Sequence, residues 1–311
     1  MSERHPLVAE VHEARRRFLE LVAAVRPQLH RYCARMLGSL ADGEDVVQDT
    51  LARAYYALAE LDEIPALRPW LFQIAHNRAI DLLRRHDRQT REPLDVADDA
   101  ADPGPDAEDA LAGQEAVRAA MSRFLELAPA QRSAVILKDV LGHSLDEIAA
   151  LLGLTVPAVK AALHRGRVRL RALEAAAPGE ASAAAPRQPS EAVARYAQLF
   201  NARDWDAVRA MLAEDVELDL VSVSRRAGRR DVGVYVARYA SMDDWRLVPA
   251  WLDGREVLAV FHGARDPLPG YFIELVAAGG KITAIRDFRH VRYIAVDARF
   301  DFAAPPAGPT G

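Results

Sequence analysis

Two segments of the chain are too polar and too rich in proline to join a hydrophobic core, and they divide the sequence into three parts. The first, Glu92–Ala112, holds eight acidic residues, three prolines and no basic residue. The second, Pro178–Ser190, consists mainly of alanine, proline and serine. Such segments bury too little apolar surface to offset the entropy lost on ordering them. We therefore predict linkers at 91–113 and 178–190, and folded parts at 1–90, 114–177 and 191–301.

Length and composition limit the class of protein. A chain of 311 residues corresponds to about two domains, and half of its residues are apolar, which is enough for packed cores. No apolar run approaches the roughly 20 residues that span a bilayer, and the N-terminal residues lack the hydrophobic core of a signal peptide. The single cysteine, Cys33, excludes an internal disulfide and a multi-cysteine zinc site. We expect a cytoplasmic protein without membrane span, metal or cofactor.

The charge is segregated along the chain. The net charge of −5 argues weakly against binding to nucleic acid. However, Thr155–Leu173 carries five basic residues and no acidic one, in contrast to the acidic first linker. A basic stretch is often only a solvated helix face, but a polyanion responds to the local patch and not to the average charge. The structural context of this stretch therefore decides its role.

The first part has the spacing of amphipathic helices. In the segment 66–88, a buried stripe is expected from Leu71, Ile74, Ala75, Ala79 and Leu82. The opposite face is polar and carries Gln73, Asn77, Asp81 and Arg84. Each of these residues alone is compatible with a solvated surface. Together with Trp70, Phe72 and nearby arginines they suit the binding of unpaired bases, which need stacking surfaces and cations.

The second part has the signature of a helix-turn-helix. Ser144 and Glu147 form a capping box that starts a helix of about two turns, and Gly153 ends it. Thr155 is a suitable N-cap for the next helix, where Pro157 is tolerated in the first turn. That second helix carries a basic stripe of the kind that fits the major groove of DNA. Its members are Lys160, His164, Arg167 and Arg171.

These motifs resemble a known family. The runs GEDVVQDTLARAYYAL and RPWLFQIAHNRAIDLLRR are similar to region 2 of extracytoplasmic-function sigma factors, which direct bacterial RNA polymerase to promoters. The resemblance implies that Asp45, Gln48 and Asp49 contact the β′ clamp of core polymerase. It also implies a −10 DNA surface and a loop at 62–66 that holds a flipped base. The residues of that surface are Trp70, Asn77, Asp81, Arg84 and Arg85.

The helix-turn-helix is similar to region 4 of the same family, which reads the −35 element and contacts the β flap. The resemblance implies that the helix begins with residues near base edges, namely Thr155, Val156, Ala158, Lys160 and Ala161. It places three further residues on phosphates, namely His164, Arg165 and Arg167. The acidic linker would thread through polymerase as a mimic of nucleic acid, or would be a simple tether.

The third part is expected to be α+β. Helices are predicted at 191–200 and 204–213, followed by strands at 216–223, 245–251, 256–261, 271–276 and 281–288, with a hairpin turn at 278–280. This order resembles the SnoaL-like cone fold. The predicted fold class is therefore multi-domain, with two all-α sigma domains and a C-terminal α+β SnoaL-like cone.

The role of the cone has two interpretations. Free-standing relatives use an aspartate or a His–Asp pair for proton transfer in an apolar pocket. The candidates for the polar groups are Asp219, His262, Asp287 and His290, and those for the walls are Trp245, Trp251, Phe261 and Tyr271. We favour a regulatory domain over an enzyme, with the cone acting in place of a separate anti-sigma factor. The alternative is a small-molecule-binding or catalytic cone.

Other function classes explain less of the sequence. A conventional DNA-binding repressor would account for the second part alone, and an enzyme tethered to DNA would account for the third part alone. We therefore predict an alternative sigma factor without catalytic residues of its own, whose partners are core RNA polymerase and promoter DNA.

Overall fold

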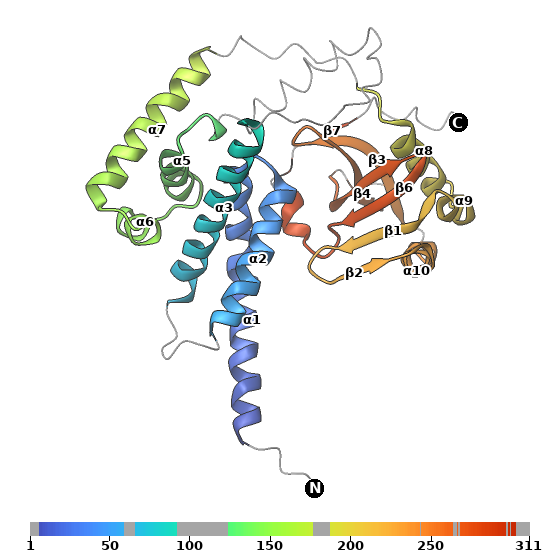
Figure 1. Ribbon diagram of the computed structural model, residues 1–311, viewed down its shortest axis with the longest axis horizontal. Coiled ribbons are helices and arrows are strands. Elements are labelled where there is room, and N and C mark those ends of the chain that lie inside the picture. The colour runs from blue at the N-terminus through green and yellow to red at the C-terminus, as the bar shows by residue number, and fades with distance from the viewer. Residues whose placement is uncertain are drawn as a thin grey trace. The chain divides into compact units, whose positions relative to one another are not determined.

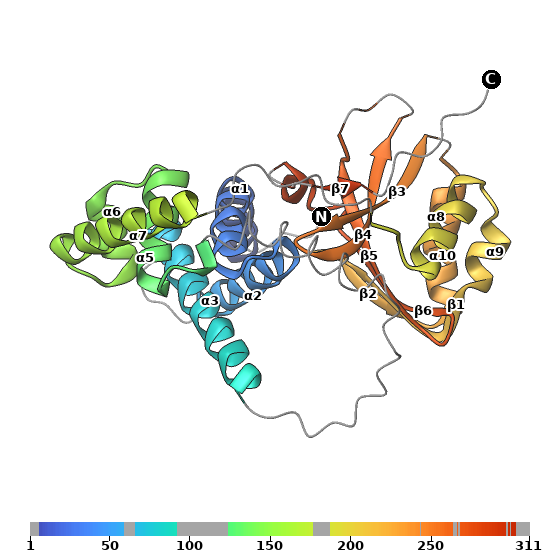
Figure 2. The ribbon, with the colours of Figure 1, turned by 90° about the horizontal axis from the view of Figure 1, so that it is seen from above.

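The computed structural model describes residues 6–58, 66–91, 124–176, 187–242, 244–263, 266, 268–296, 298 and 300–302. The chain divides into two compact units (Figures 1 and 2), one comprising Met1–Asp99 with Met121–Pro178 and the other Ala100–Ala120 with Gly179–Gly311. Residues 62–65 of the predicted loop and residues 92–113 and 178–186 of the two predicted linkers lie outside the described residues. The domain boundaries given above stay predictions.

The first unit is helical. Its elements are α1 (Pro6–Leu37), α2 (Leu40–Leu58), α3 (Leu67–Arg91), α5 (Pro129–Val135), the π-helical η1 (Ile136–Val140), α6 (Leu145–Leu152) and α7 (Val156–Ala176). The stripe predicted on α3 is confirmed, because Leu71, Ala75 and Ala79 are fully buried. Cys33 is buried in α1 as a free thiol, as expected for a small apolar filler.

One hydrophobic core serves the whole first unit. It joins residues of α1–α3, such as Leu29 and Leu71, to residues of the later helices, such as Ile136 and Leu163. Two glycines allow close helix packing. A Cβ at Gly43 would lie 2.7 Å from the Ala34 backbone, and one at Gly166 would lie 2.8 Å from a methyl group of Val135. Side chains larger than hydrogen at these positions would push the helices apart.

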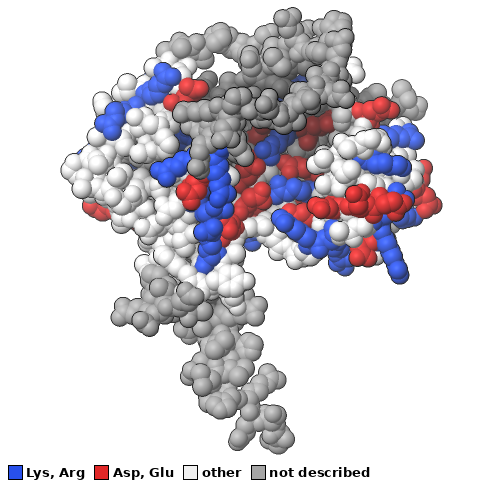
Figure 3. All heavy atoms as spheres, viewed as in Figure 1, with Lys and Arg blue, Asp and Glu red and all other residues white. Residues whose placement is uncertain are grey.

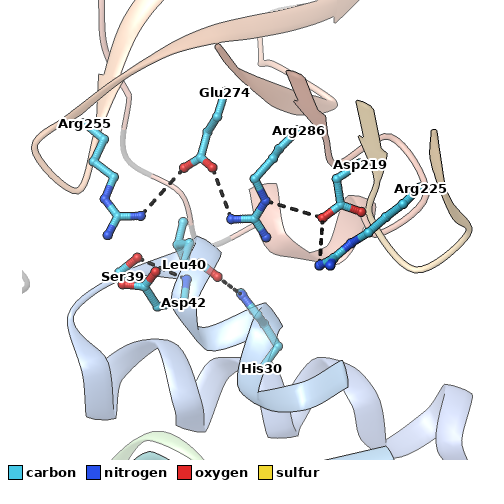
Figure 4. Close-up of polar contacts among 9 residues, drawn as sticks. All are labelled: His30, Ser39, Leu40, Asp42, Asp219, Arg225, Arg255, Glu274 and Arg286. Carbon is cyan, nitrogen blue, oxygen red and sulfur yellow. Dashed lines mark hydrogen bonds and ion pairs between the residues drawn. The ribbon is translucent and has the colours of Figure 1, made fainter. Parts of the chain in front are cut away.

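Local capping forms the helix-turn-helix as the sequence predicts. Ser144 and Glu147 form a complete capping box at the start of α6. Gly153 ends that helix in the left-handed conformation, with φ of 63°. The Ala158 backbone N–H donates to Thr155 Oγ1 at 3.3 Å, so Thr155 caps α7. A similar cap begins α2, where the Asp42 N–H donates to Ser39 Oγ at 3.2 Å (Figure 4).

The second unit is α+β, as predicted. Its elements are α8 (Glu191–Asn201), α9 (Trp205–Ala210), β1 (Leu212–Leu220), β2 (Ser224–Ala227), α10 (Arg229–Ala240), β3 (Trp245–Leu252), β4 (Arg255–His262), β5 (Tyr271–Ala278), β6 (Lys281–Asp287), the 3₁₀ helix η2 (Arg292–Ala295) and β7 (Asp301–Phe302). The strand order is β2-β1-β6-β5-β4-β3-β7. Only the β1–β6 pair is parallel among the described strands. Helices α8, α9 and α10 lie against one face of this curved sheet (Figure 2).

The four strands predicted between 245 and 288 are confirmed, and so is the hairpin turn, where Gly279 and Gly280 have positive φ. One prediction about helices was wrong, and one helix was not predicted. The helix predicted at 204–213 ends at Ala210, and strand β1 begins two residues later. Helix α10 was missed because its valines, at 232, 234 and 236, alternate as they would in a strand.

Candidate nucleic-acid interface and C-terminal cavity

Helix α3 presents a continuous polar face. Asn77, Asp81, Arg84 and Arg85 are exposed, whereas Trp70 is half-buried and packs against the core. The residues predicted to lie along −10 DNA therefore share one accessible helix face, apart from the anchored tryptophan. The amides, arginines and indole of this face can hydrogen-bond, pair with phosphates and stack on bases.

The residues predicted to contact polymerase lie on α2 and differ in their surroundings. Asp45 is exposed, whereas Gln48 and Asp49 are half-buried. Asp49 forms ion pairs with Arg53, at 3.1 Å, and with Arg78 of α3. The Gln48 Nε2 atom is buried and has no hydrogen-bond partner in the described part of the chain. Asp49 thus joins α2 to α3, while the amide of Gln48 retains an unused donor.

The predicted −35 residues lie along α7, where Figure 3 shows a row of basic side chains. Lys160, His164 and Arg165 are exposed, and none of them pairs with an acidic side chain of the described residues. Arg167 differs, because its guanidinium binds both carboxylate oxygens of Asp139 at 2.5 and 2.9 Å. Among the basic side chains predicted to contact phosphates, only Arg167 forms an ion pair with a described acidic side chain.

The other −35 residues lie at the start of the same helix. Thr155 is exposed, whereas Val156, Ala158 and Ala161 are half-buried. Thr155 also uses its hydroxyl oxygen as the helix cap. The side chains nearest to the predicted base edges are therefore mostly small and apolar, so that they offer few hydrogen bonds to bases.

A polar cluster joins the helices of the first unit. The Tyr32 hydroxyl of α1 lies 2.7 Å from His76 Nδ1 of α3 and donates to Ser133 Oγ of α5 at 3.1 Å. His76 Nδ1 lies 3.3 Å from the same serine oxygen. Burial lowers the pKa of His76, because the charged imidazolium loses its hydration there. The cluster is therefore adapted to a neutral imidazole.

A buried arginine strengthens the same contact. Arg132 of α5 is 5% exposed and donates to the carbonyl oxygens of Met36, at 2.5 Å, Leu125, at 2.6 Å, and Leu127, at 3.1 Å. Met36 lies in the last turn of α1, where carbonyls have no partner within the helix. Arg132 thus caps α1 from a residue 96 positions away in the chain.

A groove of about 630 Å³ runs along this contact within the first unit. One wall consists of α3 residues, including Arg84, and the other consists of residues 125–130 and the end of α6. One of the predicted −10 residues therefore lies beside the segment that begins the helix-turn-helix.

The second unit contains a smaller cavity of about 270 Å³. Its walls come from β1, β2, α10 and the segment after β6. The lining residues are Leu220, Arg226, Tyr235, Arg238, Ser241, Met242, Arg289 and His290.

An aspartate lies buried beside this cavity. Asp287 is 0% exposed, and its Oδ2 accepts hydrogen bonds from the hydroxyls of Tyr235 and Tyr239, each at 2.8 Å. Its Oδ1 accepts the backbone N–H of Arg289 at 2.8 Å. The Tyr239 hydroxyl also lies 2.7 Å from that of Tyr271. Burial raises the pKa of Asp287, while these hydrogen bonds oppose the rise.

The structure brings together some of the residues predicted for the cone pocket. Asp287 lies in the tyrosine cluster, and the ring of Tyr271 lies 5.7 Å from that of Trp245. His290 lines the cavity. His262 does not line it, but packs on Trp245 with ring centroids 4.3 Å apart and lies 3.2 Å from Asp244.

Three other predicted pocket residues lie elsewhere. Trp251 is six residues along β3 from Trp245, about 20 Å away, beneath Arg187. Leu258 and Val260 of the same strand face the core, so Phe261 points to the opposite face of the sheet. There it packs on Phe302 of β7. Neither residue lines the cavity. Trp251 lies too far along the strand, and Phe261 lies on the other face of the sheet.

Asp219 also faces away from the cavity, because its neighbours Leu218 and Leu220 point into the core. It lies 3.6 Å from both Arg225 and Arg286, in a row of alternating charges across five strands (Figure 4). The row continues from Arg286 to Glu274 and Arg255. Asp219 is therefore part of a paired surface.

Sequence reasoning missed the tyrosines of α10. Tyr235 and Tyr239 are four residues apart, so that one helix face presents both to Asp287. That spacing was the available signal, but the alternating valines concealed the helix.

The described residues contain no group of three or more His, Cys, Asp or Glu side chains that could hold a metal ion. No single described helix is long and apolar enough to cross a membrane, although the bent pair α6 and α7 together meets that criterion by length and composition.

The sequence matches two protein families. Sigma-70 region 2 matches residues 21–89, and Sigma-70, region 4 matches residues 118–170. The chain is 33% identical over 207 residues to the ECF RNA polymerase sigma factor SigG of Mycobacterium tuberculosis, and spans 55% of its length. That match covers 58% of this chain. It is 30% identical over 162 residues to SigW of Bacillus subtilis, covering 50% of this chain and 87% of SigW.

Solved structures show weaker likeness. The extracytoplasmic function sigma factor SigJ of Mycobacterium tuberculosis is 23% identical with a TM-score of 0.34, covering 86% of this chain and 95% of that one. The epoxide hydrolase/cyclase-like enzyme SalBIII is 24% identical with a TM-score of 0.24, covering 31% and 85%.

Proposed function

This chain belongs to the extracytoplasmic-function sigma factors, and from that premise we propose that it binds core RNA polymerase and directs it to specific promoters. One observation carries the proposal. Each of the two family-matched segments exposes a polar or basic helix face, on α3 and on α7, while the opposite faces share one core. Because its partners are bacterial polymerase and DNA, we place the protein in the cytoplasm.

Recognition of the −10 element is assigned to α3. Its exposed face combines an amide, Asn77, with the two cations Arg84 and Arg85. These groups suit melted DNA, whose bases and phosphates are both accessible. The half-buried Trp70 would offer the edge of its ring while the core fixes its position.

Recognition of the −35 element is assigned to α7, the second helix of the helix-turn-helix. Lys160, His164 and Arg165 are exposed and have no described acidic partner, so that they can pair with phosphates without first breaking an ion pair. Base contacts are expected to be few, because Val156, Ala158 and Ala161 carry no hydrogen-bonding side chain. Specificity would then depend largely on DNA shape.

The described arrangement of the first unit corresponds to a closed state of the sigma factor. The −10 and −35 elements are about 25 base pairs apart, which is roughly 85 Å of B-DNA. A compact unit of about 130 residues has a radius of gyration near 14 Å, so that α3 and α7 cannot reach both elements while they share a core. We infer that promoter binding separates α3 from α5, breaking the Tyr32–His76–Ser133 cluster.

The C-terminal unit is proposed to regulate this activity. It has a core of its own, which promoter recognition does not require. Catalysis is not proposed for it, since Asp287 is fully buried and all its described hydrogen bonds are internal. A general base must reach the proton that it removes. The cavity beside Asp287 favours ligand binding as the alternative role of this unit.

The main experiment separates polymerase binding from DNA recognition. Asp45→Ala with Gln48→Ala should abolish retention of core polymerase in a pull-down. Asn77→Ala with Arg84→Ala should leave retention intact and abolish transcription from a cognate promoter. Loss of retention in both variants would indicate general unfolding, and normal retention in the first would refute the docking surface.

A second experiment tests the −35 assignment. Lys160→Ala and Arg165→Ala should each weaken −35 DNA binding and lower the salt slope by about 0.9 for each phosphate contact that is lost. An unchanged slope in both variants would place the basic stripe in solvent.

A third experiment tests the regulatory role. The full chain is compared with a chain that ends at Ala177, at equal protein concentration, for polymerase affinity and promoter output. We expect higher output from the shorter chain. Equal output and equal affinity would refute regulation by the C-terminal unit.

A further inference from the structure

The cavity of the second unit is lined by three arginines from three different elements. Arg226 lies on β2, Arg238 on α10 and Arg289 on the segment after β6. The β-sheet register explains why Arg226 turns inward. It pairs with Leu218, whose side chain lies in the core, whereas the adjacent Arg225 pairs with the outward Asp219.

None of these cations forms an ion pair with an acidic side chain of the described residues. Other cations of the unit do so, for example Arg209, Arg225 and Arg286. Asp287 lies nearest to the cavity, but its oxygens accept two tyrosine hydroxyls and a backbone N–H. Asp287 interacts electrostatically with Arg289 and offsets part of the positive charge, whereas Arg226 and Arg238 form no ion pair with a described carboxylate.

Arg289 is held in position by aromatic rings. Its guanidinium lies 5.2 Å from the ring centre of Tyr239 and 5.8 Å from that of Trp245. Such cation–π contacts orient the planar group without using its N–H donors. The donors remain available for an acceptor that enters the cavity, and a guanidinium fork matches a carboxylate in bidentate geometry.

The rest of the lining is apolar or aromatic. Leu220, Tyr235 and Met242 contribute to the walls, and the volume of about 270 Å³ lies just under the range of drug-sized sites. A small ligand with an apolar body and one anionic group fits both properties. A DNA phosphate fits less well, because the cavity is concave and a duplex backbone would need an exposed surface.

We propose that this cavity is a binding site for a small organic carboxylate, with Arg226, Arg238 and Arg289 binding the carboxylate group and Leu220, Tyr235 and Met242 contacting the apolar body. The site is formed by the second unit alone. It would bind its ligand whether or not the first unit initiates transcription.

The test uses the full-length chain and three probes, benzoate, salicylate and hexanoate, with benzamide as the neutral match of benzoate. Binding is measured by calorimetry and by the intrinsic tryptophan fluorescence, to which Trp245 beside the site contributes. At least one carboxylate should bind in the millimolar range or tighter, and benzamide should bind at least tenfold more weakly. Each hydrogen-bonded charge pair contributes enough for about a tenfold change in affinity.

Arg238→Gln and Arg226→Gln should each weaken carboxylate binding about tenfold. The matched control is Arg230→Gln, which removes an exposed cation of the same helix, α10, that does not line the cavity. It should leave the affinity unchanged. Arg238 is exposed, so its replacement is expected to leave the fold intact, which circular dichroism checks.

Three outcomes would overturn the proposal. They are absence of binding by all three carboxylates, equal binding of benzamide and benzoate, and equal weakening by Arg230→Gln and Arg238→Gln. Loss of duplex DNA binding in Arg238→Gln with unchanged benzoate affinity would also overturn it, because the arginines would then form a phosphate-binding surface. None of these results depends on polymerase binding, so they leave the proposed sigma activity to its own tests.

Discussion

Each unit buries a charged side chain that is held by neutral groups, and the two charges are opposite. The helical unit buries Arg132, whose guanidinium donates to three backbone carbonyls. The α+β unit buries Asp287, whose carboxylate accepts from two tyrosine hydroxyls and one backbone N–H. Neither charge has a salt-bridge partner among the described residues. Both are stabilised by hydrogen bonds from neutral groups. The helical unit also buries Glu44, which forms an ion pair with Arg26.

The architecture explains the difference. Helix ends leave carbonyls without intrahelical partners, and a buried cation can satisfy several of them at once. In a sheet the strand ladders use most backbone groups, so that a buried anion depends on side-chain donors, here the hydroxyls on α10. The buried Arg132 is therefore bound through backbone atoms, whereas the buried Asp287 is bound mainly through side chains.

The largest effect is expected at Asp287. Asp287→Ala leaves the buried Tyr235 hydroxyl and the Arg289 N–H without their acceptor and removes one of the two partners of the Tyr239 hydroxyl. It should destabilise the second unit by about 4 kcal/mol. Denaturant unfolding followed by tryptophan fluorescence measures this, because three of the four tryptophans, at 205, 245 and 251, lie in the second unit.

The matched control is Asp219→Ala, which removes a partly exposed carboxylate of the same sheet. It should cost less than about 1 kcal/mol. Equal losses for the two variants would contradict the special role of the buried anion.

Arg132→Met should have the next largest effect, because it removes the donor of three carbonyls in two buried contacts and one part-buried contact. We expect a loss of about 3 kcal/mol, confined to the first unit. The far-ultraviolet circular dichroism at the helix wavelength reports mainly on that unit, because its helices α1, α2, α3 and α7 are longer than α8, α9 and α10 of the second unit. Arg169→Met, which removes an exposed arginine 3.5 Å from Glu126, should cost less than about 1 kcal/mol. A small loss for Arg132→Met would show that water can replace the guanidinium at these carbonyls.

The neutral imidazole of His76 should make the stability of the first unit depend on pH. The folded state lowers the pKa of His76 below the value of about 6.5 of the unfolded chain. The unfolded chain therefore takes up the additional proton as the pH falls through about 6.5, and the stability of the fold, complete above that pH, decreases below it. Acidic pH should likewise favour separation of α3 from α5.

The measurement compares the wild type with His76→Gln between about pH 7.5 and about pH 5.5. The variant should lose less stability over this range. Some dependence should remain, because burial also lowers the pKa of His143. Identical profiles would assign the effect to other groups.

The smallest effect on stability is expected when the exposed Arg167 loses its ion pair with Asp139, in contrast to the loss of the buried Arg132. Asp139→Asn removes the carboxylate that neutralises Arg167, at a cost below about 1 kcal/mol. DNA binding should tighten, with the salt slope increasing by about 0.9 if Arg167 then contacts a phosphate. Filter binding over a salt series measures both, and Asp146→Asn, on the exposed surface of α6, is the control.

The sequence alone was sufficient for several features encoded at short spacing. The buried stripe of α3, the capping box at Ser144 and Glu147, and the four central strands of the second unit were predicted because residues two to four apart define a face or a cap. The family followed from the same local motifs. The predicted contacts with polymerase and DNA stay predictions.

The tertiary structure decided which distant groups meet. Arg132 and Met36 are 96 residues apart, and Tyr235 and Asp287 are 52 apart, so that no local period joins either pair. The same holds for the inward turn of Arg226, which depends on its pairing with Leu218. The helix α10 itself was not predicted from its alternating valines, of which Val232 and Val236 are buried and Val234 is exposed. Local spacing determines the face on which a side chain lies, and packing between distant elements determines what that face contacts.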